Sequence, residues 1–337
     1  MKEALLYESL DGNKVRCNLC NHQCRIREGK RGICGVRENR EGTLYTLVYG
    51  KVVAEHIDPI EKKPLFNFLP GSKALSIGTV GCNFRCKHCQ NADISQYPHT
   101  HGGKVIGEDR SPEQIVIRAK ATGCESIAYT YTEPTIFYEF AYDTAALAHR
   151  EGIKNVFVSN GYMSAEAARQ IAPHLDAINI DLKAFTDKFY KEICSARLTP
   201  VLETIQRMKA LGMWVEVTTL IIPGLNDAED ELREIARFVK SVGHEVPWHV
   251  TAFYPAYKLT NRPPTPVATL HRVREIGMEA GLRYVYEGNV PGEAGENTYC
   301  YGCGAVVIER SGLGFIRNRL HDGKCPQCGQ TIDGVGM

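Results

Sequence analysis

The sequence predicts an α/β protein built on a parallel β-sheet, with a cysteine-rich appendage at each end. From residue 74, short β-branched runs alternate with helical patterns, and this order implies a parallel sheet with right-handed crossovers. Residues 1–72 are instead loop-rich, and a Gly- and Cys-rich texture returns after residue 290. The predicted domains are therefore residues 1–72, 73–290 and 291–337. An open or closed (β/α) barrel and a doubly wound sheet are both compatible with this pattern.

Seven segments have the apolar, β-branched composition of buried strands: 74–80, 126–130, 155–160, 177–182, 214–221, 248–253 and 283–287. Six helical patterns lie between them, at 111–123, 134–152, 164–174, 199–212, 227–243 and 267–281. Ser111 is the expected N-cap of the first helix, with Pro112 in its first turn. In both candidate folds the functional residues lie at the carboxyl ends of the strands.

The charge balance argues against partners held by a global electrostatic field. The chain has 40 Lys and Arg against 39 Asp and Glu, a formal net charge of +1. Residues 25–40 are locally basic, which is typical of a solvated surface and, less often, of a polyanion contact. No apolar run is long enough to span a bilayer, and the first residues lack the build of a secretory signal. We therefore expect a cytoplasmic protein without membrane partners.

Thirteen cysteines in a chain without a secretory signal indicate metal ligation rather than disulfides. Cys82, Cys86 and Cys89 have C-x3-C-x2-C spacing directly after the first predicted strand. Thiolates select iron–sulfur clusters, zinc or copper(I), and three protein ligands usually leave one coordination position open. The alternative is a zinc knuckle with a fourth ligand elsewhere, such as His88.

Two further groups of four cysteines flank the predicted sheet. Cys300, Cys303, Cys325 and Cys328 form two C-x2-C knuckles, the four-thiolate pattern of a zinc ribbon or rubredoxin, so zinc or iron is expected there. Cys17, Cys20, Cys24 and Cys34 could hold zinc or an auxiliary iron–sulfur cluster. Cys124 and Cys194 have no partners in the sequence, and we interpret them as small buried apolar residues.

Several segments together resemble one enzyme family. TVGCNFRCKHCQN (79–91) carries the signature of the radical S-adenosylmethionine superfamily. DPIEKKPLFNFLPG, YTYTEPT, SNGY, IDLKAF and WHVTAFYPAYK make the chain similar to the AmmeMemoRadiSam family, which is related to pyruvate formate-lyase activating enzymes. The resemblance implies an incomplete parallel (β/α)6 barrel. It also implies a [4Fe-4S] cluster on Cys82, Cys86 and Cys89, whose open iron binds S-adenosylmethionine and whose electron splits it into methionine and a 5′-deoxyadenosyl radical.

The same resemblance suggests residues that contact the cofactor at the strand ends. These are Thr132, Glu133, Ser159, Asn160, Asp181, Lys183, His249 and Asn289. For three of these sites a purely structural role stays open. Glu133 could form a salt bridge, SNGY could be a simple turn, and His249 could be a buried histidine bonded to a backbone carbonyl. In DPIEKKPLF, the four charged residues could line a substrate mouth or carry surface charge; they are Asp58, Glu61, Lys62 and Lys63.

We expect an enzyme in which the radical abstracts hydrogen from a substrate outside the chain. The substrate could be a partner protein, as in glycyl-radical activation, or another molecule. Family resemblance implies a low-potential electron donor such as flavodoxin or ferredoxin, and pathway partners that are Memo-like and AMMECR-like. The alternatives are an RNA-binding or RNA-modifying protein using the knuckles and residues 25–40, and a purely structural zinc scaffold. The near-neutral charge argues against nucleic acid.

Overall fold

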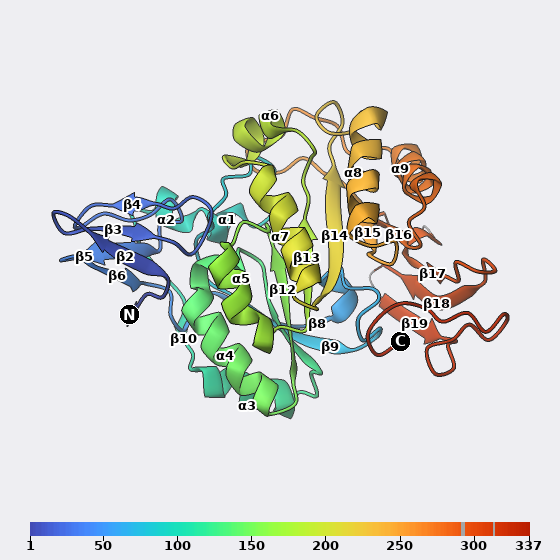
Figure 1. The fold of residues 1–337 in the computed structure, drawn as a ribbon, viewed down its shortest axis with the longest axis horizontal. Coiled ribbons are helices and arrows are strands. Elements are labelled where there is room, and N and C mark those ends of the chain that lie inside the picture. Colours follow the sequence, from blue (N-terminus) through green and yellow to red (C-terminus); the bar gives the residue numbers. More distant parts are fainter. Residues whose placement is uncertain (291–293, 313) are drawn as a thin grey trace.

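The computed structural model describes residues 1–290, 294–312 and 314–337, and an eight-stranded sheet forms its centre (Figure 1). The strand order is β16-β15-β14-β13-β12-β11-β9-β8, and every neighbouring pair is parallel except β8 and β9. Along the chain the strands are β8 (Ala54–Pro59), β9 (Lys73–Gly78), β11 (Ser126–Tyr129), β12 (Lys154–Ser159), β13 (Ala177–Asp181), β14 (Trp214–Ile221), β15 (Trp248–Ala252) and β16 (Val285–Gly288).

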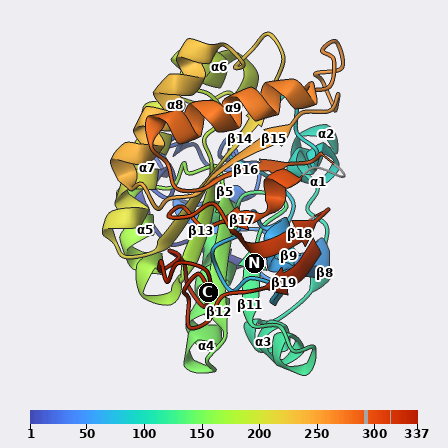
Figure 2. The same ribbon diagram turned by 90° about the vertical axis from the view of Figure 1, so that its right-hand side faces the viewer.

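One long helix follows each of the first six parallel strands, so the barrel has six βα units and a seventh parallel strand, β16 (Figures 1 and 2). The helices are α3 (Pro112–Ala121), α4 (Tyr138–Arg150), α5 (Ala165–Ile171), α7 (Thr199–Ala210), α8 (Glu229–Val242) and α9 (Val267–Ala280). Within the described residues, edge strands β16 and β8 are not paired with each other. The expected incomplete parallel barrel is thereby confirmed.

Shorter helical turns stand in the connections. They are α1 (Ala92–Ser95), α2 (Tyr97–Thr100), α6 (Asp187–Phe189), a π-helical turn η4 (Tyr190–Cys194), and the 3-10 turns η1 (Ile60–Lys62), η2 (Pro134–Phe137), η3 (Ala172–His174) and η5 (Ala294–Glu296). Helix α3 begins as its sequence predicts. Ser111 is the N-cap, its Oγ accepts from the backbone N of Gln114, and the Gln114 side chain accepts from the backbone N of Ser111.

The segment between β8 and β9, residues 60–71, fills the inside of the barrel, and we call it the plug segment. Leu65 and Phe68 are fully buried against residues of the strands, including Ala128 and Val156. The carboxylate of Glu216 on β14 accepts hydrogen bonds from the backbone N atoms of Phe66 and Asn67, at 3.0 and 2.9 Å. The plug segment therefore belongs structurally to the barrel interior, although it precedes the first parallel strand.

The first fifty residues form small antiparallel sheets to one side of the barrel, at the left of Figure 1. One contains β1 (Lys2–Glu3), β6 (Thr43–Thr46) and β5 (Arg37–Arg40), the second contains β2 (Tyr7–Leu10), β3 (Lys14–Cys17) and β4 (Arg25–Ile26), and β7 (Lys51–Val52) pairs with β10 (Glu108–Asp109). Strands this short leave little periodicity in a sequence, which explains why the segment reads as loops.

The C-terminal residues lie on the opposite side of the barrel, coloured red in Figures 1 and 2. They contain the antiparallel sheet of β17 (Thr298–Tyr299), β18 (Val306–Ser311) and β19 (Gly314–Asn318). The predicted domain boundary after residue 290 falls at residues 291–293, which lie outside the described residues. In the described part of the chain, no helix is both long enough and apolar enough to cross a membrane.

Candidate active site

The loop after β9 brings three cysteines to one cavity at the carboxyl end of the strands. Cys82, Cys86 and Cys89 all line a cavity of about 570 Å³. Cys82 and Cys86 are buried and Cys89 is half-buried. Gly81, immediately before Cys82, has a φ of +98°, a left-handed conformation that strains residues with a Cβ atom. The glycine therefore allows the chain to turn sharply from the strand into the cysteine loop.

Several polar groups already touch the sulfur atoms. The backbone N of Phe84 and the Nδ2 of Asn160 each lie 3.4 Å from the Sγ of Cys82, and the Sγ of Cys89 lies 3.3 Å from the Oγ of Ser95. Burial raises the pKa of the Cys82 thiol well above its ordinary value. Hydrogen bonds of this kind stabilise a thiolate once a metal has removed the proton.

Cys194, which looked isolated in the sequence, lies beside this loop. The backbone N of Arg85 donates to the carbonyl of Cys194, and that of Lys87 to the carbonyl of Ile193, at 2.9 and 3.0 Å. A hydrogen bond from the Cys194 thiol is the largest cause of the lowered pKa of Cys86. Cys194 is buried, as the sequence predicts, but it also supports the cysteine loop through a contact that no spacing could indicate.

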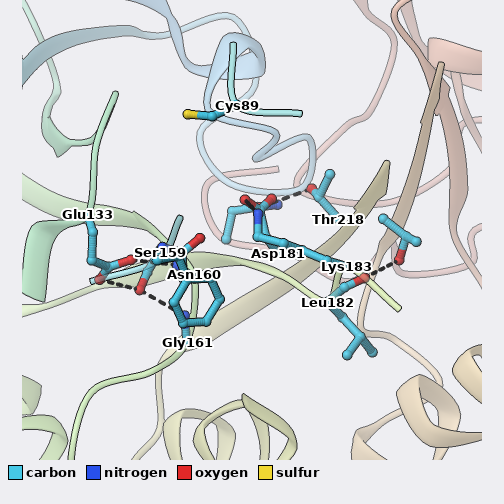
Figure 3. Close-up of polar contacts among 12 residues, drawn as sticks. Cys89, Glu133, Ser159, Asn160, Gly161, Asp181, Leu182, Lys183 and Thr218 are labelled. Atoms are coloured by element: carbon cyan, nitrogen blue, oxygen red, sulfur yellow. Dashed lines mark hydrogen bonds and ion pairs between the residues drawn. The ribbon is translucent and has the colours of Figure 1, made fainter. Parts of the chain in front are cut away.

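The eight predicted cofactor-contact residues do not all face the cavity. Thr132, Ser159, Asn160, Asp181, Lys183, His249 and Asn289 line it. Glu133 is fully buried behind Ser159 and Asn160, as Figure 3 shows. Its Oε1 accepts from Ser159 Oγ at 2.9 Å and from Thr135 N at 3.0 Å, and its Oε2 accepts from Asn160 N at 2.7 Å. Among the described residues Glu133 thus forms no salt bridge, and its carboxylate holds the SNGY turn in place.

Asp181 and Lys183 pair with each other at the centre of the site (Figure 3). Lys183 Nζ lies 2.8 Å from Asp181 Oδ2. Burial alone would lower the pKa of Lys183, but the Asp181 carboxylate and the nearby Cys86 and Cys194 sulfurs raise it overall. The ammonium therefore keeps its charge beside the cysteine loop.

His249 has a carboxylate partner rather than the backbone carbonyl considered above. Its Nε2 lies 2.6 Å from the Oε2 of Glu216, the residue that also accepts from the plug segment. The ring packs edge-on against Phe66, with 4.7 Å between centroids. Sequence reasoning missed Glu216, although a lone carboxylate within the apolar run WVEVTTLI (214–221) was a usable signal.

Three of the four charged residues of DPIEKKPLF are buried: Asp58, Glu61 and Lys63. Glu61, Lys62 and Lys63 line the cavity, and Lys63 Nζ is buried 2.7 Å from Asp58 Oδ2. Tyr131 OH donates to the same carboxylate oxygen at 2.8 Å. Burial would raise the pKa of Asp58, but hydrogen bonds from Lys62 and Lys63 lower it overall. Both alternatives are therefore found: Glu61 and Lys63 are buried in the cavity wall, whereas Lys62 lines the cavity with a side chain that is 52% exposed.

The cysteine groups differ in the spacing of their sulfurs. Cys300 Sγ lies 3.6 Å from Cys328 Sγ, and Cys303 Sγ lies 3.7 Å from Cys325 Sγ. Metal–sulfur bonds of about 2.3 Å in a tetrahedron put sulfurs about 3.8 Å apart. Among the described residues, this is the only group of three or more ligands whose atoms all lie within 4.8 Å of one another. The C-terminal cysteines therefore fit one metal ion.

Cys82, Cys86 and Cys89 do not meet that single-ion condition, and neither does any set that includes His88. Among the described residues, the closed zinc knuckle considered in the sequence analysis therefore lacks a set of ligand atoms close enough to bind one ion. Three thiols spread around an open cavity instead fit an iron–sulfur cluster, in which each thiolate binds a different iron. The neighbouring cavity leaves room for a ligand on the iron that has no protein ligand.

Comparison with known proteins agrees with this geometry. Residues 76–239 match the model of the radical SAM superfamily. The chain is 50% identical over 336 residues to an uncharacterised protein of Methanocaldococcus jannaschii, covering 99% of both chains. It is 25% identical over 222 residues to pyruvate formate-lyase 1-activating enzyme of Escherichia coli strain K12, covering 61% of this chain and 89% of that enzyme.

Among solved structures, Streptococcus suis SuiB bound to S-adenosylmethionine has a similar fold. The TM-score is 0.51 at 13% sequence identity, over 68% of this chain and 53% of SuiB. Its likeness concerns the fold alone. The family match over the barrel shows an enzyme, and with the converging cysteines of the first loop it implies a [4Fe-4S] cluster and S-adenosylmethionine. The chain belongs to the radical S-adenosylmethionine superfamily.

Proposed function

We propose that this enzyme cleaves S-adenosylmethionine reductively at a cluster held by Cys82, Cys86 and Cys89, and uses the product radical on a substrate in the same cavity. One observation carries the proposal: three thiols at a strand end converge on a cavity whose other walls are polar residues from neighbouring strand ends. When bound, the cluster and the sulfonium cofactor supply methionine and a 5′-deoxyadenosyl radical. The protein must bind, orient and shield these groups.

The polar wall divides into positioning and binding residues. Glu133 is a positioning residue, because its carboxylate fixes Ser159 and the backbone of Asn160. We assign Thr132, Ser159, Asp181 and Lys183, which line the cavity, to the charged methionyl and ribose groups of the cofactor, and Asn289 and nearby backbone groups to its adenine.

The end of the cavity lined by the plug segment is the proposed substrate site. Glu61, Lys62 and Lys63 contribute charges there, and His249 is held in one orientation by Glu216. A reactive carbon radical needs the substrate C–H bond in contact and water kept out, which a barrel interior provides.

The relationship to the activating enzyme supports one substrate class. We propose a segment of a partner protein, modified by hydrogen abstraction, with a low-potential donor such as flavodoxin or ferredoxin supplying the electron. Membership of the AmmeMemoRadiSam family, and therefore Memo-like and AMMECR-like pathway partners, is part of this proposal. We assign zinc to the C-terminal cysteines, because one-ion spacing and a small appended sheet are typical of a structural site.

The alternative RNA-binding function gains no support from the geometry of residues 25–40. Arg37 is buried and pairs with Glu139, and Arg31 and Arg40 both pair with Glu38. Three of the six basic residues of this segment are thus paired with carboxylates of the protein, and the other three, Arg25, Arg27 and Lys30, are exposed.

The proposal is tested with anaerobically reconstituted, reduced protein and S-adenosylmethionine. We expect 5′-deoxyadenosine to form, and Cys86→Ala to abolish its formation. Cys124→Ala, which removes a buried cysteine outside the three groups, is the matched control and should retain turnover. Unchanged turnover in Cys86→Ala would refute the site.

A further inference from the structure

The N-terminal cysteines form a second site that the reaction above does not use. Cys17, Cys20, Cys24 and Cys34 all line one small pocket, together with Arg37 and His22. They come from the end of β3, the turn after it and the loop before β5. Cys17 and Cys34 are buried, while Cys20 and Cys24 are half-buried. Four thiols gathered in one pocket have the composition of a ligand set for a soft metal ion or an iron–sulfur cluster.

These four sulfurs do not meet the single-ion distance condition that the C-terminal sulfurs satisfy. No three of them lie within 4.8 Å of one another. The same is true of Cys82, Cys86 and Cys89, which belong to a cluster-binding motif. A single ion draws its thiolates to about 3.8 Å, whereas a cluster spreads them over several irons.

The pocket also supplies what a buried anionic cluster needs. Backbone hydrogen bonds from His22, Ile33 and Val36 reach the sulfurs of Cys20, Cys24 and Cys34 respectively. The buried guanidinium of Arg37 lies 3.6 Å from the Sγ of Cys17 and pairs with Glu139. Hydrogen bonds and a nearby positive charge both stabilise ligating thiolates.

This pocket contacts the barrel cluster loop on both sides of Cys82. His22 Nε2 lies 2.7 Å from the carbonyl oxygen of Asn83. On the other side, a Cβ atom built on Gly81 would lie 3.0 Å from the carbonyl oxygen of Cys34. Both chain neighbours of Cys82 therefore touch residues of the N-terminal group.

We propose that Cys17, Cys20, Cys24 and Cys34 bind a second iron–sulfur cluster, which passes electrons to the cluster at Cys82, Cys86 and Cys89. One electron enters the second cluster from a low-potential protein donor and leaves it to reduce the first, and no bond is made or broken. Cys20 and Cys24 are half-buried, so this cluster would lie within reach of the protein surface. The exposed side chains of Arg25, Arg27 and Lys30 next to it favour an acidic donor.

The test uses a full-length variant in which Cys82, Cys86 and Cys89 are all replaced by Ala. After anaerobic reconstitution, we expect this variant to retain acid-labile sulfide and a paramagnetic signal after dithionite reduction. Adding Cys24→Ala should remove both, whereas adding Cys124→Ala instead should leave both. Acid-labile sulfide decides the question because a single zinc or iron ion at the C-terminal site contains none.

Zinc without sulfide in the triple variant would overturn the proposal, and so would sulfide that survives Cys24→Ala. The first of these results does not depend on whether the Cys24 variant folds. In the reduced wild-type protein, the two clusters should broaden each other's paramagnetic signals. Two unbroadened signals would overturn the electron-transfer role. None of these measurements requires cleavage of S-adenosylmethionine, so they are independent of the proposed activity.

Discussion

The Nδ2 atom of Asn160, directly after β12, lies 3.4 Å from the Sγ atom of Cys82, in the loop that follows β9. Glu133 fixes the backbone of Asn160 from behind with a 2.7 Å hydrogen bond. Three strand ends are thus connected to one cluster ligand, and the contact makes the cluster sensitive to a residue that is not a ligand.

Asn160→Ala should weaken catalysis without removing the cluster. Loss of a hydrogen bond to a charged acceptor costs about 1.5–3 kcal/mol, so the cluster becomes harder to reduce and 5′-deoxyadenosine forms about tenfold or more slowly. The reduction potential and the cleavage rate are the measurements. Asn261→Ala, at an exposed position, is the control. An unshifted potential in Asn160→Ala would contradict the assignment.

Lys183→Met should weaken cofactor binding. The variant removes a charge that Asp181 holds in the cavity beside Cys86, and we expect the Kd for S-adenosylmethionine to rise roughly tenfold, or about 1.4 kcal/mol. Equilibrium dialysis measures this change. Lys191→Met removes an exposed lysine paired with Asp187 and should leave the Kd as it is. Equal affinities in all three proteins would exclude Lys183 from the binding site.

Asp58→Asn should destabilise the barrel interior by roughly 3 kcal/mol, because it leaves the buried Lys63 ammonium without its partner. The pKa of Asp58 is lower in the folded protein than in the unfolded chain. The charged carboxylate therefore contributes fully to the free energy of unfolding above the unfolded-state pKa of about 4, and this contribution is lost as the pH falls through the folded-state pKa. In denaturant unfolding, the free energy of unfolding of Asp58→Asn should be lower than that of the wild type by a constant amount between pH 5 and 8. This difference in free energy should become smaller only below pH 4. Asp109→Asn breaks an exposed pair and should cost less than about 1 kcal/mol.

Arg310→Ala should lower the free energy of unfolding, because it removes the contacts of Arg310 between the C-terminal sheet and the plug segment. Arg310 is buried, pairs with the fully buried Glu61 of the plug segment and donates to the carbonyl oxygen of Phe66. Removing it strands a buried carboxylate, at a cost of about 3–5 kcal/mol in the free energy of unfolding. Arg319→Ala breaks the exposed pair with Glu309 and should change stability by less than about 1 kcal/mol. Similar losses in the two variants would show that the pair with Glu61 is not important.

Deletion of residues 296–337 should leave the barrel cluster in place but lower substrate-dependent turnover. The C-terminal residues pack on Phe66 and Tyr286, and Phe66 packs on His249 in the cavity. Iron content and substrate-dependent 5′-deoxyadenosine formation are the two readouts. Equal turnover with and without these residues would show that they do not shape the cavity.

The sequence by itself determined the strand and helix order, the three cysteine groups and most of the polar strand ends. Local patterns suffice there, because strand and helix periodicity, caps and metal-ligand spacing are written within a few residues of chain. Seven of the eight suggested cofactor residues line the cavity for the same reason: parallel strands all end at one edge.

Only the tertiary structure decided which charges and sulfurs meet across long stretches of chain. Cys194 beside the Cys86 loop, Glu216 beneath the plug segment and Arg310 on Glu61 are contacts between residues far apart in sequence. No local spacing encodes them, because burial brings these groups together and then requires each buried charge to find a partner. The tertiary structure also brought the C-terminal sulfurs within the distances of a single ion and left the N-terminal ones outside that condition, a difference that two four-cysteine sequence patterns do not encode.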